Sequence, residues 1–271
     1  MDHDTGMTMA GMKEADPAEV VPERAMSPSA EDPALRLASH VEAAGLVPPL
    51  LPEEYRYASL PLCIIDAVFS IGVRYGTTAA TVARFCERAG WPRVAPSREA
   101  RGPGSHGLSD LLALHDGRTL EEAADRLYGN RQRTSARSGI LKAEAVRLFA
   151  EALVQAGIES FEDLAPASLA RAELAIRTLP GQASGIAFNY FRMLAGDDNL
   201  IKPDRMVLRF VAEALVTDTE PQPQEAARLV HLATEMLRER GQPWTPLSLD
   251  HAIWRHQSGR EPLQAAAALE G

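Results

Sequence analysis

Two helical segments meet at a very tight turn in residues 176–190, which read IRTLPGQASGIAFNY. Pro180 fixes the entry into the turn, and Gly181 lets the backbone approach another chain closely. The next helix should begin with unpaired N–H groups at the positive end of its dipole, and together these can hold one phosphate group. Such contacts keep a duplex in register without reading its sequence. The turn alone is a weak signal for a contact with nucleic acid, because most Leu-Pro-Gly tripeptides are plain turns between two helices.

The sequence on both sides of this turn contains residues typical of helix starts and helix ends. Asp32-Pro33 suits an N-cap followed by proline at the first helical position, and Gly45 suits a left-handed helix end. No segment shows sustained alternation of apolar and polar residues, so we expect an all-α protein of about ten helices. The longest loop is expected at 91–107. The expected helices cover 33–45, 60–74, 77–87, 119–129, 141–157, 167–177, 183–195, 205–217, 223–240 and 246–258.

Composition excludes several classes of protein. The 271 residues are 45% hydrophobic, enough for a substantial core, and no apolar run is long enough to span a bilayer. Because the polar, acidic N-terminus is unlike a signal peptide, we expect a cytoplasmic protein without membrane contact. Cys63 and Cys86 lie in apolar helical patterns that suit buried, reduced thiols. Two cysteines cannot form a four-cysteine metal site or iron–sulfur cluster, and we expect no cofactor.

The net charge of −9 argues at first against a nucleic-acid partner. Residues 1–56 hold eleven acidic and four basic residues, however, so they carry −7 of this charge and the remainder only −2. A basic stretch, formed by Arg126, Arg131, Arg133, Arg137 and Lys142, is permissive for a phosphate-binding face, although such stretches are more often solvated. Residues 1–31 are predicted to be a disordered acidic tail. Its His3, Met7, Met9 and Met12 have ligand types that suit copper, but an unstructured leader is the simpler interpretation.

About twenty residues after the turn, the segment LIKPDRMVLRF (200–210) places Asp204 at the start of an amphipathic helix. With this order of parts the chain resembles the helix-hairpin-helix (HhH-GPD) DNA glycosylase superfamily, which includes endonuclease III. In that family a Leu-Pro-Gly-x-Gly hairpin is followed at this distance by an invariant aspartate that opens a helix. Three further segments look like core helices of the family: LCIIDAVFS (62–70), KAEAV (142–146) and DHAIW (250–254). The resemblance thus covers residues 34–260.

The resemblance implies a two-lobed helical fold. One discontinuous lobe would comprise 32–58 and 203–271, and the other, 59–202, would end in the hairpin. It assigns DNA binding to Leu179, Pro180, Gly181, Gln182, Ala183, Ser184 and Gly185. Two positions depart from the family, since Ala183 replaces its second hairpin glycine and Gly185 replaces the lysine nucleophile of members that also cut the strand. The chain is thus expected to be a monofunctional hydrolase that leaves an intact abasic site.

Asp204 is the expected catalytic residue. Breaking an N-glycosidic bond builds positive charge on the sugar, and an ionised carboxylate at a helix start can offset that charge and orient the attacking water. A structural N-cap is the alternative role for this residue. In the family, a side chain from the loop after the first core helix fills the space that the flipped nucleotide leaves in the duplex. Arg74 and Tyr75 are the candidates for this wedge residue here. Asp66 and Asn189 are polar residues in apolar helices and candidates for the base pocket.

The expected partner is double-stranded DNA, bound by a monomer associated with the nucleoid. Damaged, mismatched or enzymatically modified bases all remain candidate substrates, including modified bases of invading phage DNA. Two other functions stay open at this point: a non-catalytic DNA-binding protein on the same scaffold, and a helical protein-interaction module.

Overall fold

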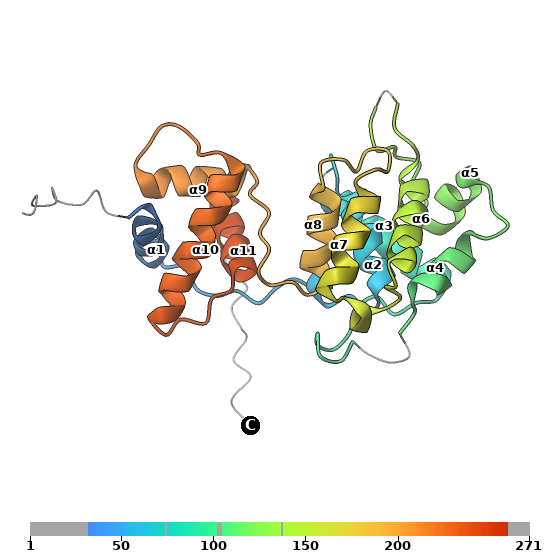
Figure 1. The fold of residues 1–271 in the computed structure, drawn as a ribbon, viewed down its shortest axis with the longest axis horizontal. Helices are drawn as coiled ribbons and strands as arrows, with labels where there is room; N and C mark the ends of the chain where they lie inside the picture. Colours follow the sequence, from blue (N-terminus) through green and yellow to red (C-terminus); the bar gives the residue numbers. More distant parts are fainter. Residues whose placement is uncertain (1–31, 74, 102–104, 137, 260–271) are drawn as a thin grey trace, which may run out of the picture. The chain divides into compact units, whose positions relative to one another are not determined.

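The computed structural model describes residues 32–73, 75–101, 105–136 and 138–259, and these residues form an all-helical protein (Figure 1). Only two isolated β-bridges, and no strand, occur among them. The expectation of an all-α fold with about ten helices is confirmed. The eleven α-helices are α1 (Pro33–Ala43), α2 (Leu60–Phe69), α3 (Tyr75–Ala89), α4 (Leu108–His115), α5 (Leu120–Ala123), α6 (Lys142–Gln155), α7 (Pro166–Ile176), α8 (Ile186–Ala195), α9 (Arg205–Leu215), α10 (Pro223–Glu239) and α11 (Pro246–Gln257).

Two hydrophobic clusters organise these helices. The first cluster is built mainly from α2 to α8, with the fully buried α2 packing against α3, α6 and α8. The second cluster is built from α1, α9, α10 and α11, which join the two ends of the described chain (Figure 1). Burial of these apolar faces is the main stabilising term of the fold. The segments 44–59 and 196–204 connect the two clusters, and Asp204 is the last residue of the second segment.

Helix α4 and the end of α2 differ from expectation. Helix α4 was not foreseen, because it is short and lies next to the expected loop; it forms because Leu108, Leu111 and His115 bury one face against the first cluster. The helix expected at 60–74 ends already at Phe69. There the Lys142 ammonium donates hydrogen bonds to the carbonyl oxygens of Phe69 (3.0 Å) and Ile71 (2.7 Å), and so satisfies acceptors that a helix end leaves open.

Both cysteines are buried in the first cluster and form no disulfide. Burial raises the pKa of the Cys63 thiol to about 12 and that of Cys86 to about 11. Neither thiol is therefore a nucleophile near neutral pH, because the thiolate is the reactive form. No described helix is long and apolar enough to cross a membrane.

Candidate functional site

Asp204 is the N-cap of α9. Its Oδ1 accepts hydrogen bonds from the backbone N–H groups of Met206 (2.8 Å) and Val207 (3.3 Å). No hydrogen bond reaches Oδ2 from the residues that the structure describes. The side chain is half-buried, so this second oxygen is available to a bound molecule. One oxygen of Asp204 therefore caps the helix and fixes the carboxylate, and the other stays open.

The carboxylate lines a cavity of about 320 Å³. Three aromatic side chains share this lining: Tyr55 of the turn η1 (Glu53–Arg56), Tyr190 of α8 and Trp254 of α11. The Lys202 ammonium lies 4.8 Å from the centre of the Tyr190 ring, a cation–π contact. A mostly apolar hollow with a few polar groups is the usual form of a small-molecule site. Its size and aromatic walls suit a flat, partly polar ring.

Charged groups gather on the cavity wall around Asp204. Asp250 lines it from α11, Lys202 from the segment before α9, and Glu54 and Arg255 complete the set. Burial raises the pKa of Asp250 well above its ordinary value, and the negative charge of Asp204 adds to this effect. The backbone and charge of Lys202 act in the opposite direction. The cavity wall thus favours the protonated form of Asp250.

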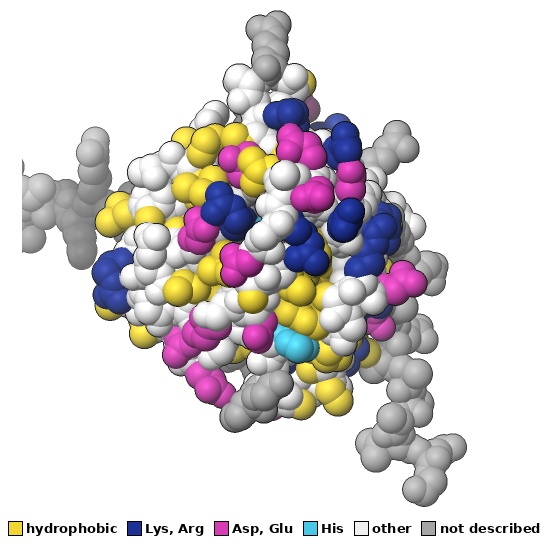
Figure 2. All heavy atoms as spheres, turned by 90° about the vertical axis from the view of Figure 1, so that its right-hand side faces the viewer, with side chains coloured by type: hydrophobic (Ala, Val, Ile, Leu, Met, Phe, Trp, Pro, Cys, Tyr) yellow, Lys and Arg dark blue, Asp and Glu magenta, His cyan; other side chains and the backbone are white. Residues whose placement is uncertain are grey.

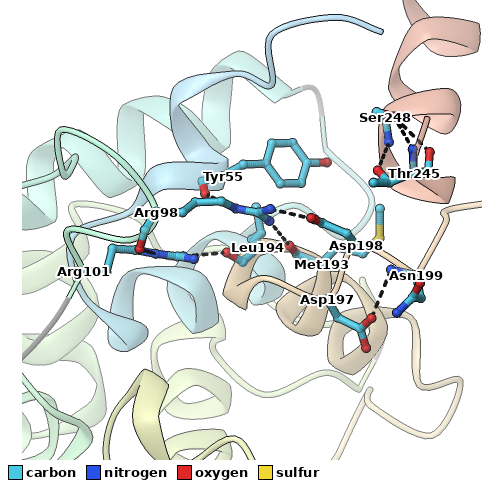
Figure 3. A network of polar contacts seen from close by, with 10 residues as sticks. All are labelled: Tyr55, Arg98, Arg101, Met193, Leu194, Asp197, Asp198, Asn199, Thr245 and Ser248. Carbon is cyan, nitrogen blue, oxygen red and sulfur yellow. Dashed lines mark hydrogen bonds and ion pairs between the residues drawn. The ribbon is translucent and has the colours of Figure 1, made fainter. Parts of the chain in front are cut away.

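A polar network holds the chain segment that leads to Asp204 (Figure 3). The Arg98 guanidinium donates hydrogen bonds to Asp198 Oδ1 (2.6 Å), to the Tyr55 carbonyl (3.1 Å) and to the Met193 carbonyl (3.5 Å). Arg101 donates to the Leu194 carbonyl (3.3 Å), so both arginines bond the open carbonyls at the end of α8. The loop containing them therefore fixes Tyr55 and the start of segment 196–204 relative to α8.

The hairpin between α7 and α8 is held by its own backbone. The N–H of Gln182 donates to the Leu179 carbonyl (3.0 Å), and the N–H of Gly185 donates to the Gln182 carbonyl (3.0 Å). Leu179 packs on the first cluster, whereas Pro180, Ala183 and Ser184 are exposed. The hairpin thus presents an exposed backbone turn to solvent. Gln182 is instead buried, and neither its amide nitrogen nor its amide oxygen has a hydrogen-bond partner within the described part of the chain.

The two departures from the family hairpin have clear local effects. Gly185 has a φ of +73° and is the N-cap of α8, so this helix starts at Ile186 rather than at the expected residue 183. A Cβ on Gly185 would lie 2.5 Å from the guanidinium of Arg177, which also donates a hydrogen bond to the Ala183 carbonyl (3.3 Å). A lysine at position 185 would therefore require Arg177 to move. This position is built for glycine.

Gly181 also has no room for a larger residue in the hairpin. Its φ is +81°, and an added Cβ would lie 2.6 Å from Cβ of Thr134. We expect Gly181→Ala to lower the free energy of unfolding by about 1–3 kcal/mol through backbone strain and this clash. Urea unfolding would measure this effect. The matched control is Gly117→Ala, because Gly117 has a φ of +70° but no atom within 4 Å of the added Cβ. Equal effects of the two substitutions would contradict a special role for the Gly181–Thr134 contact.

Neither of the two predicted pocket residues, Asp66 and Asn189, lines the cavity. Asp66 lies in α2 and is fully buried, with its Oδ2 accepting a hydrogen bond from the Tyr57 hydroxyl (2.7 Å). Asn189 is exposed on α8, and its neighbour Tyr190 lines the cavity instead. Of the wedge candidates, Arg74 lies outside the described residues and Tyr75 is the first residue of α3. The loop before it, at Ile71–Val73, borders the segment 132–136 that contacts the hairpin.

The predicted basic stretch does not form one exposed face. Lys142 is buried and bonds the end of α2, while Arg131 is exposed and paired with Asp125 through its Nε (2.7 Å). Arg126 and Arg133 are exposed, and Arg137 lies outside the described residues. Figure 2 shows basic and acidic side chains interspersed on the face that α4 and α5 present. This stretch therefore offers scattered arginines rather than a dense cationic surface.

Sequence reasoning missed the aromatic and acidic lining of the cavity. Asp250 and Trp254 are four residues apart on α11, a spacing that places both side chains on the same face of a helix. Tyr190 has a weaker signal, since it is one of several aromatics in α8. Tyr55 and Lys202 come from non-α-helical segments whose placement depends on long-range contacts. Among the described residues, no group of three or more potential metal ligands is found; His3 and the methionines of the N-terminal tail lie outside them.

A family model described as "Domain of unknown function (DUF8548)" matches residues 36–258. The chain belongs to this family. No curated protein and no solved structure matches the chain. The matched range contains the hairpin, Asp204 and every residue that lines the aromatic cavity. The family domain therefore includes the whole candidate site.

Proposed function

We propose that this protein is a monofunctional DNA glycosylase that flips a modified or mismatched base out of the duplex and hydrolyses its N-glycosidic bond. One observation carries the proposal: the helix-opening carboxylate of Asp204 keeps an oxygen available on the wall of an aromatic cavity. A carboxylate that merely capped its helix would not need such a cavity beside it. The hairpin and the number of residues that separate it from Asp204 resemble those of the HhH-GPD superfamily. This resemblance supports the same function.

The geometry suits the charge changes of the reaction. As the bond between the sugar and the base breaks, positive charge develops on the sugar. The backbone N–H groups of Met206 and Val207 hold Asp204 in place, so its carboxylate needs little reorganisation to stabilise that charge. The same carboxylate can orient a water molecule and accept its proton. Water then adds to the sugar and leaves an abasic site.

The aromatic walls supply the binding of the base. Enzymes that act on a base extrude it from the duplex and stack it between aromatic or apolar side chains. Tyr55, Tyr190 and Trp254 provide such walls, and the cavity volume of about 320 Å³ lies within the usual range for small-molecule sites. The exposed hairpin between α7 and α8 would bind the phosphate backbone beside the flipped nucleotide. Because Gly185 replaces the family's lysine, strand cleavage through a Schiff base is not part of the proposal.

The test is a screen for abasic sites. The full chain is incubated with duplexes that each carry one modified or mismatched base, and with phage genomic DNA, and alkali then cleaves any abasic position. We expect strand breaks only after alkali, because the proposed enzyme leaves the backbone intact. Salt-dependent DNA binding without abasic sites on any substrate would contradict the enzyme and favour a non-catalytic DNA-binding protein. Absence of such binding would contradict both and favour a helical interaction module.

A further inference from the structure

A second carboxyl group, that of Asp250, lines the same cavity as Asp204 and has no part in the steps described above. Asp250 lies in α11, and 7% of the residue is exposed. The backbone of Lys202, two residues before Asp204, forms a hydrogen bond with its carboxyl group. Asp250 on α11 thus bonds the short stretch of chain that leads to Asp204 at the start of α9.

The groups around Asp250 favour its protonated form. Asp204 and Glu54 contribute negative charge and Lys202 and Arg255 positive charge. Tyr55, Tyr190 and His251 complete the titratable groups on the cavity wall. Burial and the charge of Asp204 raise the pKa of Asp250, and these effects outweigh the two contributions of Lys202. Burial and Arg255 lower the pKa of His251 to about 4, so this imidazole is neutral near neutral pH. A buried carboxyl group whose pKa is raised in this way is typical of a general acid.

We propose that Asp250 is the general acid of base excision, which gives its proton to the leaving base while Asp204 faces the sugar. This inference rests on the proposed function. When the C1′–N bond breaks, its electron pair goes to the base, and the base takes the proton of Asp250. The oxygen of a water molecule bonds to C1′, and the proton that this water loses goes to Asp204 and then to solvent. Asp250 regains a proton from solvent, so one water molecule is divided between the base and the sugar.

This role of Asp250 specifies the class of substrate. An alkylated purine such as 7-methylguanine already carries positive charge and leaves as a neutral molecule without an acid. A neutral base would leave as an anion unless a proton is supplied. An acid buried beside the sugar-facing carboxylate is useful only for the second class. The cavity is therefore assigned to an uncharged modified, deaminated or mismatched base rather than to a cationic one.

The test compares the two classes of leaving base in single-turnover excision. The wild-type protein and Asp250→Asn are assayed on the neutral base that the wild type removes fastest and on 7-methylguanine. We expect Asp250→Asn to slow removal of the neutral base by about 10²-fold or more, with little change for any removal of 7-methylguanine. Asparagine keeps an oxygen for the hydrogen bond from Lys202, so the site should stay folded. Asp218→Asn, in the exposed loop after α9, is the matched control and should leave the rates unchanged.

The protonation state of Asp250 is measured separately by infrared spectroscopy of Asp66→Asn labelled at its aspartate carboxyl groups. Asp66→Asn removes the other aspartate, among the described residues, whose pKa is strongly raised by burial. A protonated carboxyl signal near neutral pH supports the proposal, and its absence overturns it even where Asp250→Asn fails to fold. Equal rates of neutral-base removal by wild type and Asp250→Asn, or wild-type activity on 7-methylguanine alone, also overturn it. Excision of no base at all refutes the proposed function itself, a result distinct from these.

Discussion

Asp204→Asn is expected to reduce single-turnover base excision by about 10³-fold or more, because it removes the charge that stabilises the cationic sugar in the transition state. The fold should remain intact, since asparagine is as good an N-cap as aspartate and can still accept the bonds from Met206 and Val207. DNA binding should persist for the same reason. Alkaline cleavage of a substrate duplex at enzyme excess measures the rate, and urea unfolding measures the stability.

Two further variants separate the catalytic role of Asp204 from its capping role. Asp204→Ala loses both the charge and the cap, so it should be as inactive as Asp204→Asn but less stable by about 1 kcal/mol. Asp218→Asn changes the same side chain in an exposed loop and should alter neither property. Wild-type excision rates in folded Asp204→Asn would restrict Asp204 to its structural role and remove the main support for a glycosylase.

The features that sequence predicts well in this protein depend on short-range chemistry. A capping aspartate, a proline and an apolar stripe at helical spacing all act within a few residues, so Asp204 and α9 are visible in the sequence. The hairpin at Pro180-Gly181 is visible for the same reason. Its exact helix start is not, because Gly185 adopts a left-handed conformation and thereby delays α8 to Ile186.

The cavity depends instead on contacts between distant segments. Tyr55, Tyr190 and Trp254 are far apart in sequence, and no local pattern distinguishes them from ordinary core aromatics. The burial of Lys142 is equally hidden, because a lysine in a helical pattern is normally assigned to the solvated face. Its partners are the carbonyls at the end of α2, about seventy residues earlier. Polar residues that act through long-range burial are thus the ones that sequence reasoning misplaced.

Asp66 provides the largest expected effect on stability. It is fully buried in α2, its Oδ2 accepts the hydrogen bond from Tyr57, and its Oδ1 has no partner among the described residues. Burial is the main cause that raises its pKa from 3.8 to about 7, while the Tyr57 hydrogen bond acts in the opposite direction. Between these two pKa values, Asp66 loses its proton more readily in the unfolded chain than in the folded protein. This group therefore lowers stability as the pH rises from about 4 to about 7.

Asp66→Asn should abolish this pH-dependent loss. Relative to wild type, the variant is expected to gain about 4 kcal/mol of unfolding free energy between pH 4 and pH 8, an order-of-magnitude value from the pKa difference. Comparison with wild type at each pH cancels the titration of all other groups, and urea unfolding supplies the free energies. Tyr57→Phe should steepen the loss, because it removes the hydrogen bond that favours the ionised carboxylate. Parallel pH profiles for wild type and Asp66→Asn would show that Asp66 ionises in the folded protein as easily as in the unfolded chain. A difference in unfolding free energy that grows up to about pH 7 and then stays constant would show that α2 holds a buried acid. Ionisation of this acid would then destabilise the folded protein at every higher pH.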